Sequence, residues 1–415
     1  MSSYLRVLRH RDFRYLFAGQ SASELGDRVV IVALALYITG RTGSPSDLGL
    51  VLFAQSLPLV ALLLFGGVWA DRMPRQRIMI ATDAIRAALH GLLAALIVAG
   101  APAIWEIVVI EVLFGAARAF FQPAYAGLIP QTVSEELIAD ARALTESMSN
   151  LAFLVGPVIA TVLVLGVGAW EAFALDAATF AVSGLLLMRI SPRRRGTPDA
   201  PAGSTMVADL RAGWREVRSR RWVWATIGVF TGSVLCVYAQ WYALAPRIAR
   251  DVYGSAGVFG GLEAAAGVGA VVGAVAALRW RPRRPLRTGM LMVLAWPLND
   301  LVFALGAPLP LVAACSVAVG FGFSLFGIWW ETALARLIPP GALSRVSAWD
   351  WMGSLAFLPF GYLLAGPLAS AFGARTVLGA GSAIGLGLLA LGLLPRETRE
   401  LSYASPSSSS RAMSA

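Results

Sequence analysis

The sequence predicts an all-α membrane protein with twelve transmembrane helices. Of its 415 residues, 57% are hydrophobic and only 14% are charged, which is too little polar surface for a soluble globule of this length. Mean hydropathy is +0.69. Runs of about 20 apolar residues, enough to cross a hydrocarbon core of about 30 Å, recur along the whole chain. These observations place the protein in a lipid bilayer.

Twelve apolar runs are expected to form the spans. The first is longer than the apolar region of a typical signal peptide, and no clear small-residue cleavage site follows it, so it predicts a span rather than a leader. The approximate limits are residues 15–39, 47–70, 78–99, 103–127, 144–167, 170–190, 222–246, 256–279, 287–306, 309–334, 346–369 and 375–394.

The arginines indicate the orientation. The chain has no lysine, and its 34 basic residues gather before the first span, in the even-numbered connections and in the central connection. The positive-inside rule therefore predicts a multi-pass protein of the cytoplasmic membrane with both termini in the cytoplasm. We interpret the formal charge of +10 as topology and contact with anionic lipid, not as nucleic-acid binding. The main exceptions, in odd-numbered connections, are Arg41, Arg247, Arg250 and Arg375.

A central stretch rich in proline and arginine divides the chain into two halves of six spans. Residues 128–131 (Leu-Ile-Pro-Gln) are echoed by residues 337–340 (Leu-Ile-Pro-Pro), and residues 150–154 by residues 354–358, at equivalent places in the halves. Such weak internal symmetry is typical of transporters built from repeats. The expected domains are an N-terminal six-helix bundle (1–190), a cytoplasmic linker (191–221), a C-terminal six-helix bundle (222–395) and a disordered cytoplasmic tail (396–415).

The most specific local pattern lies at the cytoplasmic end of the second span. Gly67 permits close helix contact, and Asp71 can meet the positive N-terminal end of a neighbouring helix. The spacing resembles the signature of the major facilitator superfamily, although Pro74 stands where that family usually has glycine. An ordinary positive-inside loop would explain the arginines but not the spacing of glycine and aspartate. The resemblance implies a gate made of Gly67, Asp71, Arg72, Arg75 and Arg77.

Further segments extend the resemblance over almost the whole chain. They are Arg11 to Phe17, the Gly26-Asp27 pair, Asp83 with Arg86, and Leu175 to Ala177. They look like the branch that contains enterobactin exporters and macrolide-efflux proteins. The resemblance implies the major facilitator fold, with twelve helices in two pseudo-symmetric bundles, and the export of siderophores, antibiotics or other amphiphiles. It does not choose the cargo.

The fifth span carries a pattern similar to a reduced antiporter motif of drug exporters. Ala152, Gly156 and Ala160 recur at four-residue spacing and give a smooth face for close helix packing, with Pro157 after the central glycine. Ala152 and Ala160 stand where the motif has glycine. The alternative is a general packing seam of small residues.

The predicted spans also contain charged residues, each of which costs about 2.5–3.5 kcal/mol near the bilayer centre even on a lenient insertion scale. Each is therefore expected to face protein or water. In the first span Gln20, Glu24 and Asp27 fall at i, i+4 and i+7 and form one polar stripe. The superfamily resemblance implies that spans one, four, seven and ten line a central cavity, which brings Arg118 of span four to the same path.

A carboxylate that alternates between water and an arginine partner changes its proton affinity. We predict Asp27 and Glu24 as proton-coupling sites, with Arg118 as their counter-charge. The alternative is a static ion pair that only fixes helix packing. Asp83 and Arg86, at i and i+3, are expected to be a structural charge pair. His90 is expected to be a packed or hydrogen-bonded residue rather than a proton relay, and the remaining outer candidates are Glu111, Asp176, Glu263 and Asp300.

A cargo pocket is expected from polar and aromatic residues on the cavity helices. Aromatic rings on spans seven and ten could stack on a flat amphiphile. The alternative for several of them, Trp329 and Trp330 above all, is a belt at the membrane interface. The candidates are Gln20, Gln122, Tyr238, Trp241, Tyr242, Trp330 and Glu331.

The sequence argues against several classes of protein. Without lysine there is no Walker A motif, so ATP binding through a P-loop is not expected. Cys236 and Cys315 are far apart and suggest neither a disulfide framework nor a metal site, and neither enzymatic activity nor a cofactor is expected. The prediction is a secondary transporter that exports small molecules by proton antiport. An importer or facilitator on the same fold is the alternative, and a transporter-like scaffold finds little support.

Overall fold

The computed structural model describes residues 6–100, 102–191 and 206–401, with the backbone alone at 63–72, 206–210, 340, 341 and 344. Regular structure in this part of the chain is entirely helical. The chain folds into two compact units, and the boundaries between them fall inside α11 and α17 as well as between helices.

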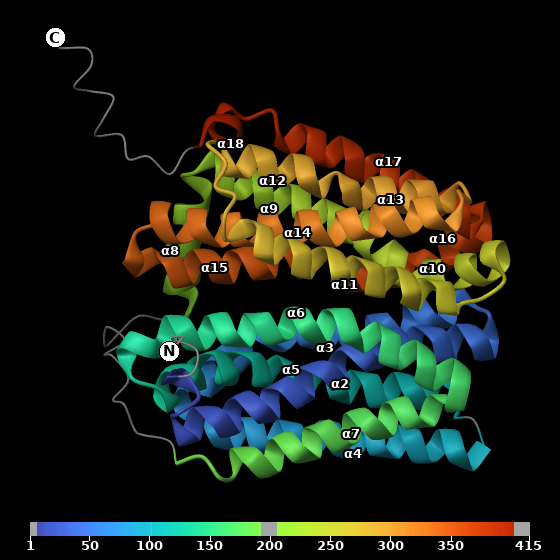
Figure 1. The fold of residues 1–415 in the computed structure, drawn as a ribbon, viewed down its shortest axis with the longest axis horizontal. Helices are drawn as coiled ribbons and strands as arrows, with labels where there is room; N and C mark the ends of the chain where they lie inside the picture. The colour runs from blue at the N-terminus through green and yellow to red at the C-terminus, as the bar shows by residue number, and fades with distance from the viewer. Residues whose placement is uncertain (1–5, 101, 192–205, 402–415) are drawn as a thin grey trace. The chain divides into compact units, whose positions relative to one another are not determined.

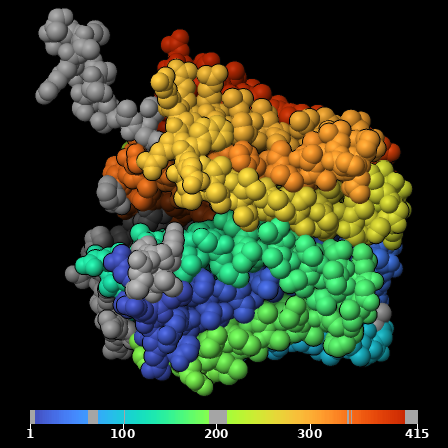
Figure 2. All heavy atoms as spheres, viewed as in Figure 1, coloured from blue at the N-terminus to red at the C-terminus, as the bar shows by residue number. Residues whose placement is uncertain are grey.

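The first unit contains the six N-terminal helices, α10, α16 and the first part of α11. In Figure 1, α4 and α7 lie side by side along one edge of this unit. Figure 2 shows α2, in blue, between α6 and α7, in two shades of green. The elements are α2 (Arg11–Thr42), α3 (Pro45–Arg72), α4 (Arg75–Gly100), α5 (Ile104–Thr132), η1 (Glu135–Leu137), α6 (Ile138–Val162), η2 (Leu163–Val167), α7 (Ala169–Leu187), α10 (Ala239–Tyr253), α11 (Gly257–Ala277) and α16 (Leu358–Phe372).

The second unit contains the remaining helices. Within it α12 packs against α14, and α15 packs against α8 and α9. The elements are α8 (Met206–Arg218), α9 (Arg221–Ser233), η3 (Val234–Tyr238), α12 (Pro285–Val293), α13 (Ala295–Ala304), α14 (Leu309–Leu337), α15 (Pro340–Leu355), α17 (Ala374–Gly392) and α18 (Arg396–Glu400).

Nine helical segments of the described chain are long and apolar enough to cross a membrane. Three further segments stand where spans were predicted: α2, α5 and the pair α12–α13. α2 carries Glu24, Asp27 and Arg28 inside its apolar stretch, and α12–α13 is interrupted at Leu294. The all-α membrane fold is therefore confirmed, and the described helices are consistent with twelve spans.

Three features differ from the simple picture of two sequence halves. Helices α10 and α16 belong to the same compact unit as α2–α7, because they pack against α2 and α3. The predicted linker 191–221 contains the helix α8. Residues 396–400, expected in a disordered tail, instead form α18, while the serine-rich end of that tail lies outside the described residues. The predicted domain boundaries stay a prediction.

The first unit places polar groups inside and apolar groups outside. Val98, Leu113 and Leu185 are exposed on its surface, as expected for side chains that face lipid. Its interior contains ionisable side chains, which are costly to bury unless they are paired. The fully or almost fully buried ones are Asp83, Arg86, His90, Glu111 and Asp176.

Candidate functional site

Arg86 of α4 is the centre of a buried charge cluster. Its guanidinium lies 2.5 Å from Asp83 one turn earlier and 3.7 Å from Asp27 of α2. The rings of Phe121 and Phe180 cover it, each centroid 4.1 Å from the guanidinium carbon. The rings exclude water and add a cation–π attraction. One cation is thus shared by two carboxylates.

His90, one helical turn beyond Arg86, joins the cluster to two more acids. Its Nδ1 lies 2.5 Å from Asp176 of α7, and its Nε2 lies 3.6 Å from Glu111 of α5. The imidazole stacks on Phe114 with centroids 4.0 Å apart. The Gln55 amide of α3 donates a 2.6 Å hydrogen bond to the other oxygen of Glu111. Four helices therefore converge on one histidine.

The second bond of this histidine is incomplete. At 3.6 Å the His90 Nε2 and Glu111 Oε1 atoms are too far apart for a normal hydrogen bond. Neither atom has a hydrogen-bond partner among the described residues, and both are buried. Unsatisfied groups of this kind are rare in protein interiors. His90 and Glu111 therefore face each other across a gap in the buried cluster.

Local sequence explains why these groups meet. Asp83, Arg86 and His90 fall at i, i+3 and i+7, so α4 presents them on one face. Gly26 of α2 faces Asp176, and a Cβ there would collide with the carboxylate. Gly115 of α5 likewise lies against the carbonyl of Gln55. Two glycines thus let the helices approach closely enough to enclose the acids.

A second polar group on α2 lies in a more open setting. Glu24 pairs with Arg28 at 3.0 Å, and their side chains are 32% and 36% exposed. The Ser149 hydroxyl of α6 donates a 3.0 Å hydrogen bond to the same Glu24 oxygen. Arg118 of α5 also acts on Glu24 electrostatically. This group is accessible, whereas the cluster around Arg86 is closed.

The structure changes the expected partner of Asp27. Within the described chain Asp27 is paired with Arg86 rather than with Arg118. Arg86 was expected only in a structural pair with Asp83, and it makes that contact as well. The reason is geometric: α4 and α2 both pack on α7, so their polar faces meet beside it. His90, expected to be a packed or hydrogen-bonded residue, stacks on Phe114 and bonds to Asp176.

The small residues of α6 lie on a buried face. Gly156 lies against the Cβ of Arg28, so α6 approaches α2 closely at this point. On another side Gly260 and Gly267 of α11 pack against Thr161 and Leu154 of α6. The seam therefore packs closely on α2 at Gly156, and another side of α6 packs on α11. The buried members are Ala152, Gly156, Pro157 and Ala160.

Several predicted cargo-pocket residues are instead engaged in the interior. The Trp241 and Tyr242 side chains donate hydrogen bonds of 2.7 and 2.6 Å to the two oxygens of Glu263. The Gln20 amide donates a 3.0 Å hydrogen bond to Ser183. Polar atoms held in this way would have to leave their partners before they could bind cargo.

Of the other cargo candidates, Trp330 is also engaged in the interior, and three are more accessible. The Trp330 indole donates a 2.9 Å hydrogen bond to Asp350 of α15, an acid that the sequence did not single out. Tyr238 is partly exposed and packs edge-on against Trp296. Gln122 and Glu331 are exposed. These last three are the candidates that the structure leaves most accessible.

The predicted gate is described only in part. The side chains of Gly67, Asp71 and Arg72 lie outside the described residues. Arg75 donates a 2.6 Å hydrogen bond to the carbonyl of Gly127 in α5, and Arg77 is exposed. The neighbouring Gln76 amide, which the sequence did not single out, donates hydrogen bonds of 2.6 and 2.8 Å to the carbonyls of Leu187 and Ile190. The short connection is thus tied to α5 and to the end of α7.

Arg247 and Arg250, which lie in an odd-numbered connection where few arginines were expected, have hydrogen-bond partners at the C-terminal end of α2. Arg250 of α10 donates a 2.9 Å hydrogen bond to the carbonyl of Thr39, and Arg247 donates one to the carbonyl of Gly43. Gly43 has a φ of 63° and ends α2 in the left-handed conformation. Both arginines therefore bind carbonyls at the negative end of a helix, where cations are favourable.

Comparisons with known proteins agree with this architecture. The chain is 28% identical to the multidrug efflux pump Tap of Mycolicibacterium fortuitum, over 94% of this chain and 97% of that protein. It is 24% identical to macrolide efflux protein A of Streptococcus pyogenes, over 58% of this chain and 59% of that protein. A bacterial homologue of the human lysosomal transporter Spinster, solved in an inward-facing and occupied conformation, is similar in fold with a TM-score of 0.70 and 17% identity, covering 96% of this chain and 99% of that one.

A family profile described as transmembrane secretion effector matches residues 2–337, most of the chain. The resemblance seen in the sequence is thus confirmed, and the described helices have the composition of a multi-pass membrane protein. The chain belongs to the transmembrane secretion effector family of major facilitator superfamily transporters.

Proposed function

We propose that the protein exports amphiphilic drugs across the cytoplasmic membrane by proton antiport, through alternating access, with both termini in the cytoplasm. The multidrug and macrolide efflux proteins to which it is similar support a drug as the cargo. A siderophore is supported only by the sequence resemblance. The arginine-rich even-numbered connections support the orientation.

The observation that carries the coupling mechanism is the charge balance of the buried cluster. Four carboxylates lie in it, against one permanent cation and one histidine. Even with the histidine protonated, four negative charges face two positive ones, which leaves two uncompensated. Buried charges without partners are strongly unfavourable, which supports the binding of protons by part of the cluster. The carboxylates are Asp27, Asp83, Glu111 and Asp176.

Asp27 is the point at which these protons exchange. Its side chain is 13% exposed, whereas those of Asp83, Glu111 and Asp176 are completely buried. Protonation of Asp27 weakens its 3.7 Å contact with Arg86 and leaves the guanidinium to Asp83. When Asp27 loses its proton, it again competes with Asp83 for the Arg86 guanidinium. A proton bound on one side of the membrane thereby changes the contact between α2 and α4.

Alternating access also needs contacts that break at the end of α2. The bonds from Arg247 and Arg250 to Gly43 and Thr39 hold α10 against this end. Both bonds are accepted by backbone carbonyls. In the proposed cycle the cluster senses the proton, and these contacts close and open the path. The gate role of Gly67, Asp71, Arg72, Arg75 and Arg77 stays a prediction.

The test is transport by purified protein in proteoliposomes with an imposed pH gradient. With an acidic lumen, protein oriented with its outer face inward should accumulate a macrolide or a fluorescent amphiphilic cation such as ethidium. Proteoliposomes treated with nigericin provide the control, because the pH gradient is then collapsed. Accumulation that persists after collapse would contradict proton coupling, and accumulation only with an alkaline lumen would favour import.

A further inference from the structure

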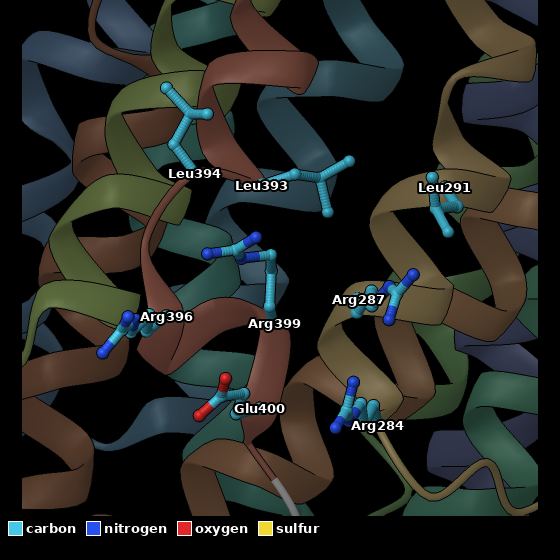
Figure 3. Close-up of a pocket in the computed structure, with 8 residues that line it drawn as sticks. All are labelled: Arg284, Arg287, Leu291, Leu393, Leu394, Arg396, Arg399 and Glu400. Carbon is cyan, nitrogen blue, oxygen red and sulfur yellow. The ribbon is translucent and has the colours of Figure 1, made fainter.

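A basic hollow lies in the second unit, away from the charge cluster. Its volume is about 520 Å³, and it is formed by α12 with the residue before it, the residues that follow α17, and the short helix α18. In Figure 3, Arg284 and Arg287 lie on one side of the hollow, and Arg396 and Arg399 of α18 lie on the other. The lining residues are Arg284, Arg287, Leu291, Leu393, Leu394, Arg396, Arg399 and Glu400.

The hollow has a strong excess of positive charge. Four arginines and one glutamate line it, which leaves three formal positive charges uncompensated. In the part of the chain that the structure describes, none of these arginines forms an ion pair with an acid. The N-terminus of α12, a helix of nine residues, opens beside it and contributes the positive end of its dipole. An anion is the ligand that this arrangement favours.

One end of the hollow is apolar. Leu291 and Leu394 are 42% and 66% exposed, and Leu393 is partly buried beside them. In Figure 3 the three leucines lie across the upper part of the view, Leu291 on the side of Arg287 and Leu393 near Arg399, and Arg284 and Glu400 lie at the lower end. A free inorganic anion would gain nothing from these leucines. A molecule with a negatively charged head and hydrocarbon chains would contact both ends.

The arginines of α18 are held in place by contacts of their own helix. The Trp222 backbone N–H donates a 3.3 Å hydrogen bond to Glu397, and Thr398 is completely buried. Through these residues α18 packs on α9 and α12. The backbone of Arg396 and Arg399 therefore has a fixed place opposite α12, and only their exposed side chains remain to be ordered by a ligand.

We infer that this hollow binds the phosphate headgroup of an anionic phospholipid in the cytoplasmic leaflet. Basic pockets between membrane helices on the cytoplasmic side are suited to such headgroups. The predicted topology places both the connection before α12 and the segment after α17 on that side. The inference concerns the second unit alone and does not depend on the proposed proton coupling.

The experiment is native mass spectrometry of the full chain released from detergent, titrated with cardiolipin, phosphatidylglycerol or phosphatidylcholine. The double variant Arg287→Gln/Arg399→Gln should bind cardiolipin and phosphatidylglycerol roughly tenfold or more weakly, since each basic residue near a membrane surface contributes about 1 kcal/mol. The matched control Arg281→Gln/Arg283→Gln removes the same amount of charge, from the connection before α12, without touching the hollow. It should change binding less than about threefold. Equal weakening in both double variants would overturn the inference in favour of a general charge effect.

A third variant tests the sign of the effect. Glu400→Gln removes the one acid that lines the hollow, so it should tighten the binding of phosphatidylglycerol by a few-fold. Unchanged or weaker binding would argue against a headgroup at this place. Inorganic phosphate and glycerol 3-phosphate, added as competitors at millimolar concentration, should leave the lipid adduct intact. Displacement by either would overturn the inference and indicate a site for a soluble phosphate.

Discussion

Two acids of helix α2, Glu24 and Asp27, lie in opposite environments, although only two residues separate them. Glu24 is about one-third exposed and pairs with Arg28 on its own helix. Asp27 turns towards α4 and shares Arg86 with the completely buried Asp83. The first pair can respond to cargo and to solvent, whereas the second can respond only to a proton that enters the protein. In the proposed mechanism, proton coupling at Asp27 and cargo contact at Glu24 are therefore separated by less than one helical turn.

Arg86→Gln should have the largest effect, because it removes the one permanent cation that the described residues place in the closed cluster. Breaking a buried pair by removing one partner typically costs about 3–5 kcal/mol. We expect a strong loss of folded protein, measured as the yield of monodisperse protein after detergent extraction and as thermal stability. The double variant Arg86→Gln/Asp83→Asn removes the stranded acid and should recover part of that loss. A single variant as stable as the wild type would show that the cluster is not held by charge.

How much of this could be predicted is clearest at Asp27 and its neighbours. A charged residue in the middle of an apolar run is energetically costly to place in a membrane, and that cost by itself indicates a functional site. The i, i+3 spacing indicates the Asp83–Arg86 pair. The partner of Asp27 could not be predicted in this way, because it depends on which faces of α2 and α4 meet beside α7. The resemblance to the superfamily pointed to Arg118, and the packing selected Arg86.

The same limit applies to residues far apart in the sequence. Glu111, His90 and Asp176 could each be recognised as a charge or histidine in a span, but their convergence needs three helices to be placed. Trp241 and Tyr242 were predicted to line the cargo pocket, since aromatic rings on a cavity helix have that role. They instead satisfy the buried Glu263. A buried carboxylate needs hydrogen-bond donors, and Trp241 and Tyr242 supply them to Glu263.

Asp27→Asn sharpens the comparison most directly. The amide keeps the size and hydrogen bonding of the side chain but cannot exchange a proton. Coupling free energies of about 1–3 kcal/mol correspond to effects of roughly 5- to 150-fold, and we expect a loss of gradient-driven accumulation in that range. Exchange of labelled cargo across proteoliposomes without a gradient should persist. Loss of both activities together with loss of folded protein would instead indicate a static ion pair.

His90→Gln should have an intermediate effect. Glutamine can still bond to Asp176, but it removes the titratable ring that lies between Asp176 and Glu111. We expect gradient-driven accumulation to fall by a few-fold, within the lower part of the range for a coupled site. The control is Phe114→Leu, which removes the stacked ring without changing any titratable group. If Phe114→Leu reduced coupling as much as His90→Gln did, the histidine would act through packing alone.

Glu24→Gln should have the smallest effect on energy coupling. The Glu24–Arg28 pair is exposed enough that its contribution to stability should be below about 1 kcal/mol. Its loss leaves Asp27 and Arg86 unchanged, so the pH gradient should still drive accumulation to within about twofold of the wild type. The recognition of a cationic cargo should change, because the accessible negative charge is gone. The apparent KM should therefore rise for ethidium but not for an uncharged amphiphile.

Ser149→Ala removes the neutral donor to the same Glu24 oxygen and provides the matched control. If Glu24→Gln abolished coupling while Asp27→Asn preserved it, the roles of the two acids would be reversed, and the open pair would be the proton site.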